Sequence, residues 1–72
     1  MTPVRYDPRT DILHFADGRT CSAVEVEANR RTWPRVLVDE CDRIMKRDRE
    51  AMRVAIYTFL SERRPDIFPT LH

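Results

Sequence analysis

The chain has few of the residues that mark an enzyme, a metalloprotein or a disulfide-bonded protein. Its 72 residues include two cysteines, Cys21 and Cys41, which form no CxxC pair, and two histidines. Cysteine and histidine at this density are too sparse and scattered for a zinc site. No catalytic or cofactor motif occurs, and His14 has no identifiable orienting partner that would make it a catalytic base. We therefore expect no enzymatic activity, no catalytic residues, no cofactor and no bound metal.

Long apolar runs are also missing. The first ten residues read MTPVRYDPRT and contain no apolar h-region, so we expect no signal peptide. No apolar run approaches the ~20 residues that cross a bilayer, so we expect no membrane partner. Two cysteines far apart in the sequence are typical of reduced thiols, which predicts a cytoplasmic protein.

A strong charge of either sign is absent. Thirteen basic and twelve acidic residues nearly cancel, so net charge gives no argument for nucleic-acid binding. Twelve of the thirteen basic residues are Arg. Arg binds carboxylate and phosphate in a bidentate manner, but a bias in the base composition of the source genome produces the same excess.

The first third of the chain predicts strands. Two short extended segments read PVRY and ILHF, and the turn between them contains Pro8 at a position that favours proline. The dipeptide Asp17-Gly18 is a strong hairpin signal, and the segment after it, CSAVEVE, alternates valine with glutamate. We predict a three-stranded antiparallel β-meander over about residues 3–27. Its register stays open, because a two-residue and a three-residue loop give Phe15 different partners.

The rest of the chain predicts helix. Thr32 is a suitable N-cap, and Pro34 fits the first helical turn, where its missing N–H is not needed. No Gly, Pro or Asn follows before Arg63, and Pro65 disfavours helix at the residue before it. We predict a helical region over about residues 33–63 and a C-terminal tail over residues 65–72.

Five consecutive charged residues, Lys46 to Glu50, lie in the middle of this region. A continuous helix would place the apolar residues on one stripe, which comprises Trp33, Leu37, Cys41, Ile44, Met45, Met52, Ala55, Ile56 and Phe59. Against one helix, Asp48 would then lie within the stripe, where an unpaired carboxylate is unfavourable. Asp48 is also a natural N-cap for a second helix.

The size of the chain favours two helices over one continuous helix. A thirty-residue helix is about 45 Å long, whereas a compact domain of this length has a radius of gyration of about 11 Å. Half of such a helix would extend past a three-stranded sheet, and only a partner chain could cover its apolar stripe. The size argument therefore favours a turn or kink near residues 47–48, and one long helix predicts a dimer or another partner.

Residues 24–62 resemble the ribbon-helix-helix family of DNA-binding regulators, in which a strand precedes two helices joined by a short turn. The segment VEVEANRRTWPRVLVDECDRIMKRDREAMRVAIYTFLSE has that order and spacing, and EAMRVAIYTFL is similar to the second helix of the family. The resemblance implies a homodimer that binds DNA as a transcriptional regulator or antitoxin. The chain departs from the pattern at Lys46, where the family usually has Gly, and at Glu25 and Glu27, which would face phosphates.

The chain also resembles a family of short bacterial proteins of unknown function. Those proteins combine a small β-meander with C-terminal helices, one of which carries a central Arg followed by apolar residues. Arg49, Met52 and Ile56 match that pattern. This resemblance implies a fold and no activity.

Candidate contact residues fall into three groups. Three Arg residues surround Trp33 near the start of the helical region, where free N–H groups favour anions; the alternative is that Trp33 is a core residue. A second basic group lies in the middle of the region, where the alternative is a solvated face with acidic neighbours. The apolar tail is the third. The candidates for partner or anion contacts are Arg30, Arg31, Trp33, Arg35, Arg47, Arg49, Arg53, Phe68 and Leu71.

Together these observations predict a single α+β domain over residues 1–72, with a three-stranded antiparallel β-meander followed by one long helix or a helical hairpin. A chain of this size buries only about 60–65% of its unfolded surface, so self-association is a plausible source of stability. We expect a small non-enzymatic binding or regulatory module that contacts itself, as a homodimer, or another protein. The alternative is a DNA-binding regulator of the ribbon-helix-helix type.

Overall fold

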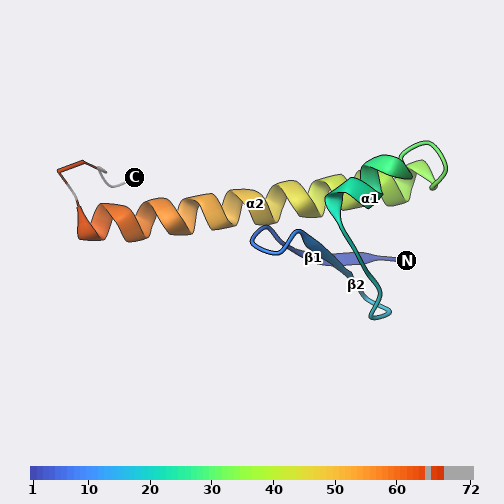
Figure 1. The fold of residues 1–72 in the computed structure, drawn as a ribbon, viewed down its shortest axis with the longest axis horizontal. Coiled ribbons are helices and arrows are strands. Elements are labelled where there is room, and N and C mark those ends of the chain that lie inside the picture. Colours follow the sequence, from blue (N-terminus) through green and yellow to red (C-terminus); the bar gives the residue numbers. More distant parts are fainter. Residues whose placement is uncertain (65, 68–72) are drawn as a thin grey trace.

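A small sheet lies against one end of a long helix in the computed structural model, which describes residues 1–64 and 66–67 (Figure 1). Three antiparallel strands in the order β1-β2-β3 form the sheet. The elements are β1 Pro3–Asp7, β2 Ile12–Phe15, β3 Thr20–Cys21, α1 Ala23–Ala28 and α2 Arg35–Arg63. The predicted α+β class is confirmed, and of the two helical alternatives the structure has one long helix.

The hairpins use the turn residues expected from the sequence. In the first turn, the Asp7 carboxylate accepts a hydrogen bond from the Arg9 N–H at 2.9 Å. In the second, the Phe15 N–H donates to the Arg19 carbonyl oxygen at 2.9 Å, and Gly18 has a φ of +88°. A three-residue loop with a left-handed glycine is a common β-hairpin connection, so the structure selects the three-residue loop.

The third strand is much shorter than predicted. Only Thr20–Cys21 pairs with β2, and residues 23–27, predicted to be extended, lie in α1. The Ser22 hydroxyl accepts a hydrogen bond from the Glu25 N–H at 3.2 Å, which caps the helix in the manner of an S-x-x-E sequence. Val26 is fully buried and Val24 is exposed, because residues two apart lie about 200° apart on a helix.

The predicted break near Arg47–Asp48 is wrong. The helix α2 runs without interruption for 29 residues, a length of about 44 Å. It begins at Arg35 with Pro34 at the N-cap position. Thr32 is not the cap that we predicted, since its hydroxyl donates to the Asn29 carbonyl oxygen at 3.2 Å.

The core lies between the sheet, α1 and the N-terminal half of α2. Its buried residues are Tyr6, Leu13 and Phe15 from the sheet, Val26 from α1, and Cys41, Ile44 and Met45 from α2. The C-terminal half of α2 extends past this core, as Figure 1 shows. The molecule therefore measures 48 × 21 × 18 Å with a radius of gyration of 15.3 Å, against about 11 Å for a compact chain of this length.

Candidate functional site

The apolar stripe of α2 changes its surroundings at Asp48. Before Asp48, Ile44 and Met45 are buried against the sheet. Beyond it, Ile56 and Phe59 are 53% and 54% exposed. We call residues 49–63 of α2 the overhang. Its apolar side, the overhang face, comprises Ala51, Met52, Ala55, Ile56, Phe59 and Leu60.

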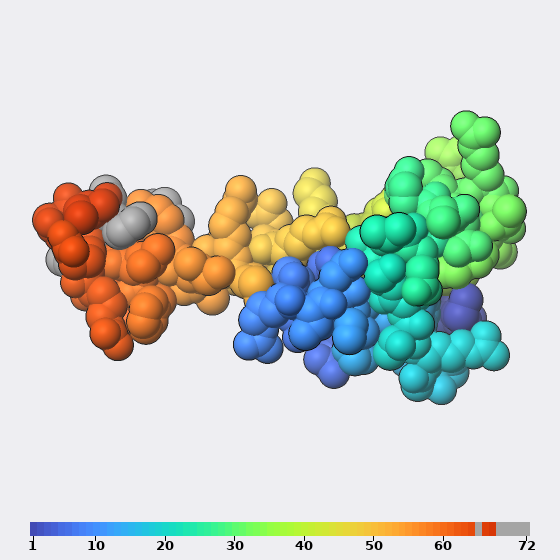
Figure 2. Space-filling model, viewed as in Figure 1, coloured from blue at the N-terminus to red at the C-terminus, as the bar shows by residue number. Residues whose placement is uncertain are grey.

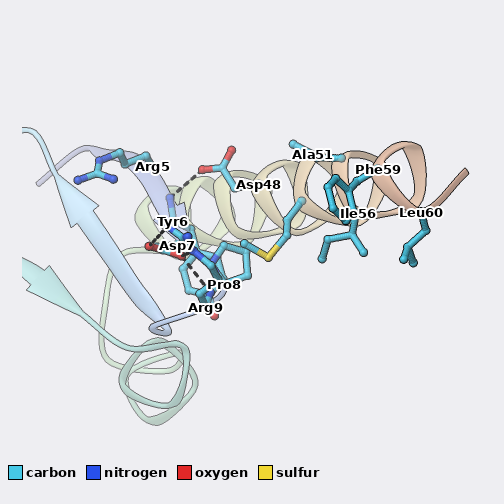
Figure 3. Close-up of a pocket in the computed structure, with 12 residues that line it drawn as sticks. Arg5, Tyr6, Asp7, Pro8, Arg9, Asp48, Ala51, Ile56, Phe59 and Leu60 are labelled. Carbon is cyan, nitrogen blue, oxygen red and sulfur yellow. Dashed lines mark hydrogen bonds and ion pairs between the residues drawn. The ribbon is translucent and has the colours of Figure 1, made fainter. Parts of the chain in front are cut away.

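A groove of about 790 Å³ lies between the overhang face and the tip of the first hairpin, residues 7–9. Figure 2 shows the corresponding notch, where the narrow bar of the overhang leaves the bulk of the molecule. Figure 3 shows Pro8 below the helix on the side toward which Ile56 and Leu60 point. The groove therefore has an apolar helical wall and a polar end formed by the sheet.

Asp48 fixes the helix to the sheet at the end of the groove. One carboxylate oxygen accepts a hydrogen bond from the Tyr6 N–H at 2.7 Å, and the other accepts one from the Arg47 Nε at 2.8 Å. Arg47 also donates to the Val4 carbonyl oxygen at 3.1 Å. The hydrogen bond from Arg47, followed by that from the Tyr6 N–H, holds the pKa of Asp48 below its ordinary value. A carboxylate inside an apolar stripe is thus paired and hydrogen-bonded.

Tyr6 extends this connection across the sheet. Its hydroxyl donates to Asp11 at 2.6 Å, and the Arg49 guanidinium lies 5.0 Å from its ring centroid. Burial, followed by the hydrogen bond to Asp11, raises the pKa of Tyr6. The same hydrogen bond, followed by one from the Ala23 N–H, lowers the pKa of Asp11. The sheet end of the groove is therefore held by contacts from β1, the first turn, α1 and α2.

The far end of the overhang carries a second stacked pair. The Arg63 guanidinium lies 4.8 Å from the centroid of the Phe59 ring, a distance at which cation–π attraction operates. On the flank of the overhang, Glu50 pairs with Arg53 at 2.5 Å. Arg63, Glu50 and Arg53 are therefore engaged within the chain, and the overhang face beside them is apolar.

The predicted contact residues near Trp33 lie at the opposite end of the molecule from the overhang. Arg30 is engaged by two acids, because its guanidinium donates to both Asp42 oxygens at 2.9 and 3.0 Å and to Glu27 at 2.9 Å. The hydrogen bonds to Asp42, followed by the one to Glu27, raise the pKa of Arg30. Trp33 is half-buried and packs against the core.

Two further Arg residues of that group are exposed. Arg31 and Arg35 line a shallow hollow beside Trp33, and Arg35 lies 3.8 Å from Asp39. With Arg30 engaged by two acids and Trp33 packed on the core, these observations support the alternative in which Trp33 is a core residue.

The central basic group is also paired within the chain. Arg47 binds Asp48, Arg49 stacks on Tyr6, and Arg53 binds Glu50. Of the predicted tail contacts, Phe68 and Leu71 lie outside the described residues. Ile67, which the structure describes, is 54% exposed.

Neither thiol is set up as a nucleophile. Burial raises the pKa of Cys21 to about 11, and burial also raises the pKa of the fully buried Cys41. Both are therefore protonated at neutral pH, and the thiolate is the reactive form. Within residues 1–64 and 66–67, no three His, Cys, Asp or Glu side chains are grouped closely enough to hold a metal ion.

The overhang face is absent from the predicted contact residues, although the stripe itself was predicted. The sequence does place Met52, Ala55, Ile56 and Phe59 on one side of a helix. It does not show where the sheet ends along that helix, so it cannot separate covered from uncovered positions. The contribution of Pro8 and the hairpin tip has no sequence signal, since it depends on packing between segments about forty residues apart.

Comparisons with models of protein families, with curated proteins and with solved structures found no significant match. Residues 24–27, where the ribbon-helix-helix resemblance implies a strand, lie in α1, and Lys46, where it implies a turn, lies inside α2. DNA binding stays a prediction that a salt titration of DNA affinity would test. Among the described residues, no helix is both long and apolar enough to cross a membrane.

Proposed function

We propose that this chain is a small non-enzymatic binding or regulatory module that acts through protein–protein contact at the overhang face. The supporting observation is the change along one helix stripe, whose residues are buried before Asp48 and half exposed at Ile56 and Phe59. Contiguous exposed apolar surface bordered by polar groups is characteristic of interaction sites.

The residues on this face are suited to binding a protein. Phe59 is a large aromatic side chain, and aromatic residues are enriched at protein interfaces. The face also lies on a helix that is joined to the sheet through Asp48 and Tyr6. A partner would therefore bind a helix whose position relative to the sheet is fixed at Asp48.

A capture experiment with matched variants tests this function. A tagged chain is mixed with the untagged chain and with an extract of the source cells. The tagged chain is then captured, and the proteins bound to it are quantified. Ile56→Glu places a charge on the overhang face, whereas Val54→Glu places the same charge on the opposite side of the same helix at a residue that is 50% exposed. We expect the wild type and Val54→Glu to retain a partner that Ile56→Glu loses by at least tenfold.

Far-UV circular dichroism of both variants controls for folding. A set of bound proteins that is the same for all three chains would contradict the proposed function, as would a partner that both glutamates remove equally.

A further inference from the structure

The overhang face has the geometry of a helix-packing surface. Met52, Ala55 and Phe59 follow the alternating three- and four-residue spacing that keeps a seam of side chains facing a neighbouring helix. Ala51 and Ala55 are one turn apart and carry the smallest apolar side chain, which lets a second helix approach closely. The occupant that fits this face is therefore a helix.

One helix of matching length and chemistry is present in the chain itself. The overhang is 15 residues long, or about 22 Å, and it exposes one apolar side. Two overhangs placed face to face would cover each other from end to end. The overhang carries three Arg and two Glu, a net charge of +1, so charge opposes this pairing only weakly.

The position of the sheet decides the orientation of two such helices. The sheet packs on the same side of α2 as the overhang face, since both line one groove. In a parallel pair, the two sheets would meet at the same end and occupy the same space. In an antiparallel pair, the end of each helix meets the hairpin tip of the other chain, and each sheet lies beyond the end of the opposite helix.

The antiparallel arrangement also places charged groups of the two chains near each other. Arg63, which is stacked on Phe59 at the helix end, would arrive beside the hairpin tip, where Asp7 already pairs with Arg9 at 3.4 Å, so charge at this end neither strongly favours nor strongly opposes the contact. The contact adds cover to a chain whose core cluster, among the described residues, comprises seven buried residues, and small domains commonly gain stability by self-association.

We infer that the overhang face binds the same face of a second copy of the chain in an antiparallel homodimer. The inference rests on the proposed function and names the partner of the same surface. An interface made of one helix face per chain is small. We expect its total buried area to lie near or below about 1,200 Å², where stable complexes begin. We expect such a dimer to dissociate at micromolar concentration.

The first test measures the mass of the purified chain by light scattering and sedimentation from low to high micromolar concentration. The chain mass is 8.6 kDa, and we expect the apparent mass to rise toward twice that value. Val54→Glu should follow the wild type, whereas Ile56→Glu should remain a monomer with unchanged far-UV circular dichroism. A wild type that stays monomeric, or two variants that dimerise equally, would overturn the inference.

The second test measures orientation with a spin label at Arg35→Cys. The Arg35 side chain is 93% exposed. The native thiols are partly or fully buried and react slowly because their pKa values are raised. An antiparallel pair centred on the overhang places the two labels about 60 Å apart, whereas a parallel pair places them within about 20 Å. The short distance would refute the antiparallel arrangement.

Other occupants give different results. A monomeric wild type that captures a different protein through Ile56 would overturn the homodimer and leave the proposed function intact. A monomeric wild type whose Phe68→Glu, Leu71→Glu double variant dimerises would show that the last residues of the chain cover the face. The absence of any binding that depends on Ile56, to either partner, would overturn both the homodimer and the proposed function.

Discussion

At the scale of single residues, Asp48 explains how a charged segment is accommodated inside one helix. The carboxylate lies in line with the apolar stripe, and its side chain is 19% exposed. It avoids the penalty for an unpaired buried charge because the Tyr6 N–H and the Arg47 guanidinium both donate to it. The hydrogen bond to Tyr6 also satisfies a backbone N–H of β1, so one side chain serves both the helix and the sheet.

Replacing Asp48 tests this role. We expect Asp48→Ala to lower the free energy of unfolding by about 1–3 kcal/mol, because it leaves the Tyr6 N–H in a part-buried site without its acceptor. Urea denaturation measures the change. Asp39→Ala is the matched control, since that carboxylate lies on the same helix, is 66% exposed and pairs with Arg35 at 3.8 Å. Its loss should change stability by less than about 0.5 kcal/mol, and equal losses in the two variants would contradict the assigned role.

At the scale of elements, the two halves of α2 differ in what supports them. The N-terminal half packs on the sheet and on α1, whereas the overhang exposes its apolar face. Helices of about 15 residues are marginal in water without tertiary packing. The overhang therefore depends on the helix that precedes it, and on a partner when one is bound.

Hydrogen exchange distinguishes the two halves. In dilute solution, where the proposed dimer would be dissociated, we expect backbone N–H groups of residues 53–63 to exchange faster than those of residues 38–48. At high micromolar concentration, protection in residues 53–63 should rise if a second chain covers that face as proposed. Mass spectrometry of peptides from each half measures both effects. Equal protection of the two halves at low concentration would show that the overhang is supported within the monomer.

Local sequence signals account for most of the elements. Segments at 3–6 and 12–15, the Asp17-Gly18 turn and a helix ending at Arg63 all agree with the structure. The strand predicted at residues 21–27 is wrong beyond Cys21, because the S-x-x-E cap at Ser22 begins a helix in which the period-two valines lie on different faces. The predicted break near Asp48 is wrong because the Tyr6 N–H donates a hydrogen bond to the Asp48 carboxylate. Tyr6 lies 42 residues away in the sequence, so the sequence does not show this donor. The candidate site could not be located for a related reason, since only packing shows where the sheet stops covering α2.

At the scale of the whole molecule, length and thickness are unequal. The longest dimension is 48 Å, whereas the other two are 21 and 18 Å. The excess length comes from the overhang, which Figure 1 shows extending past the sheet. A chain that must bury as much apolar surface as it can would be expected to fold the overhang back, so the extended form is consistent with cover from a second molecule.

The stability of the whole fold should depend on acid pH. The pKa values of Asp48 and Asp11 lie below their ordinary range in the folded chain, owing chiefly to hydrogen bonds from Arg47 and from the Tyr6 hydroxyl. The unfolded chain, with aspartate pKa values of about 3.9, therefore binds more protons in acid. Stability that is fully present well above that value is lost as the pH falls through the folded pKa values.

We expect the urea midpoint to be constant near neutrality and to fall between about pH 5 and pH 3. Asp48→Asn, whose amide does not titrate, should start from a lower midpoint and lose less of it over the same range. A wild-type midpoint that does not change down to pH 3, or an equal fall in the variant, would show that these carboxylates do not couple protonation to folding.

Asp48 also separates two groups of residues whose substitutions are expected to have different effects. The residues before it build the core, so substitutions there change whether the chain folds. Beyond it, Ile56 and Phe59 are exposed in the single chain, so under the proposed function substitutions there that keep the helix would mainly change which partner is bound. Under the proposed function, recognition would be free to diverge while the fold stays constant, and the 15 residues of the overhang are the part that could be exchanged to give the same scaffold a new partner.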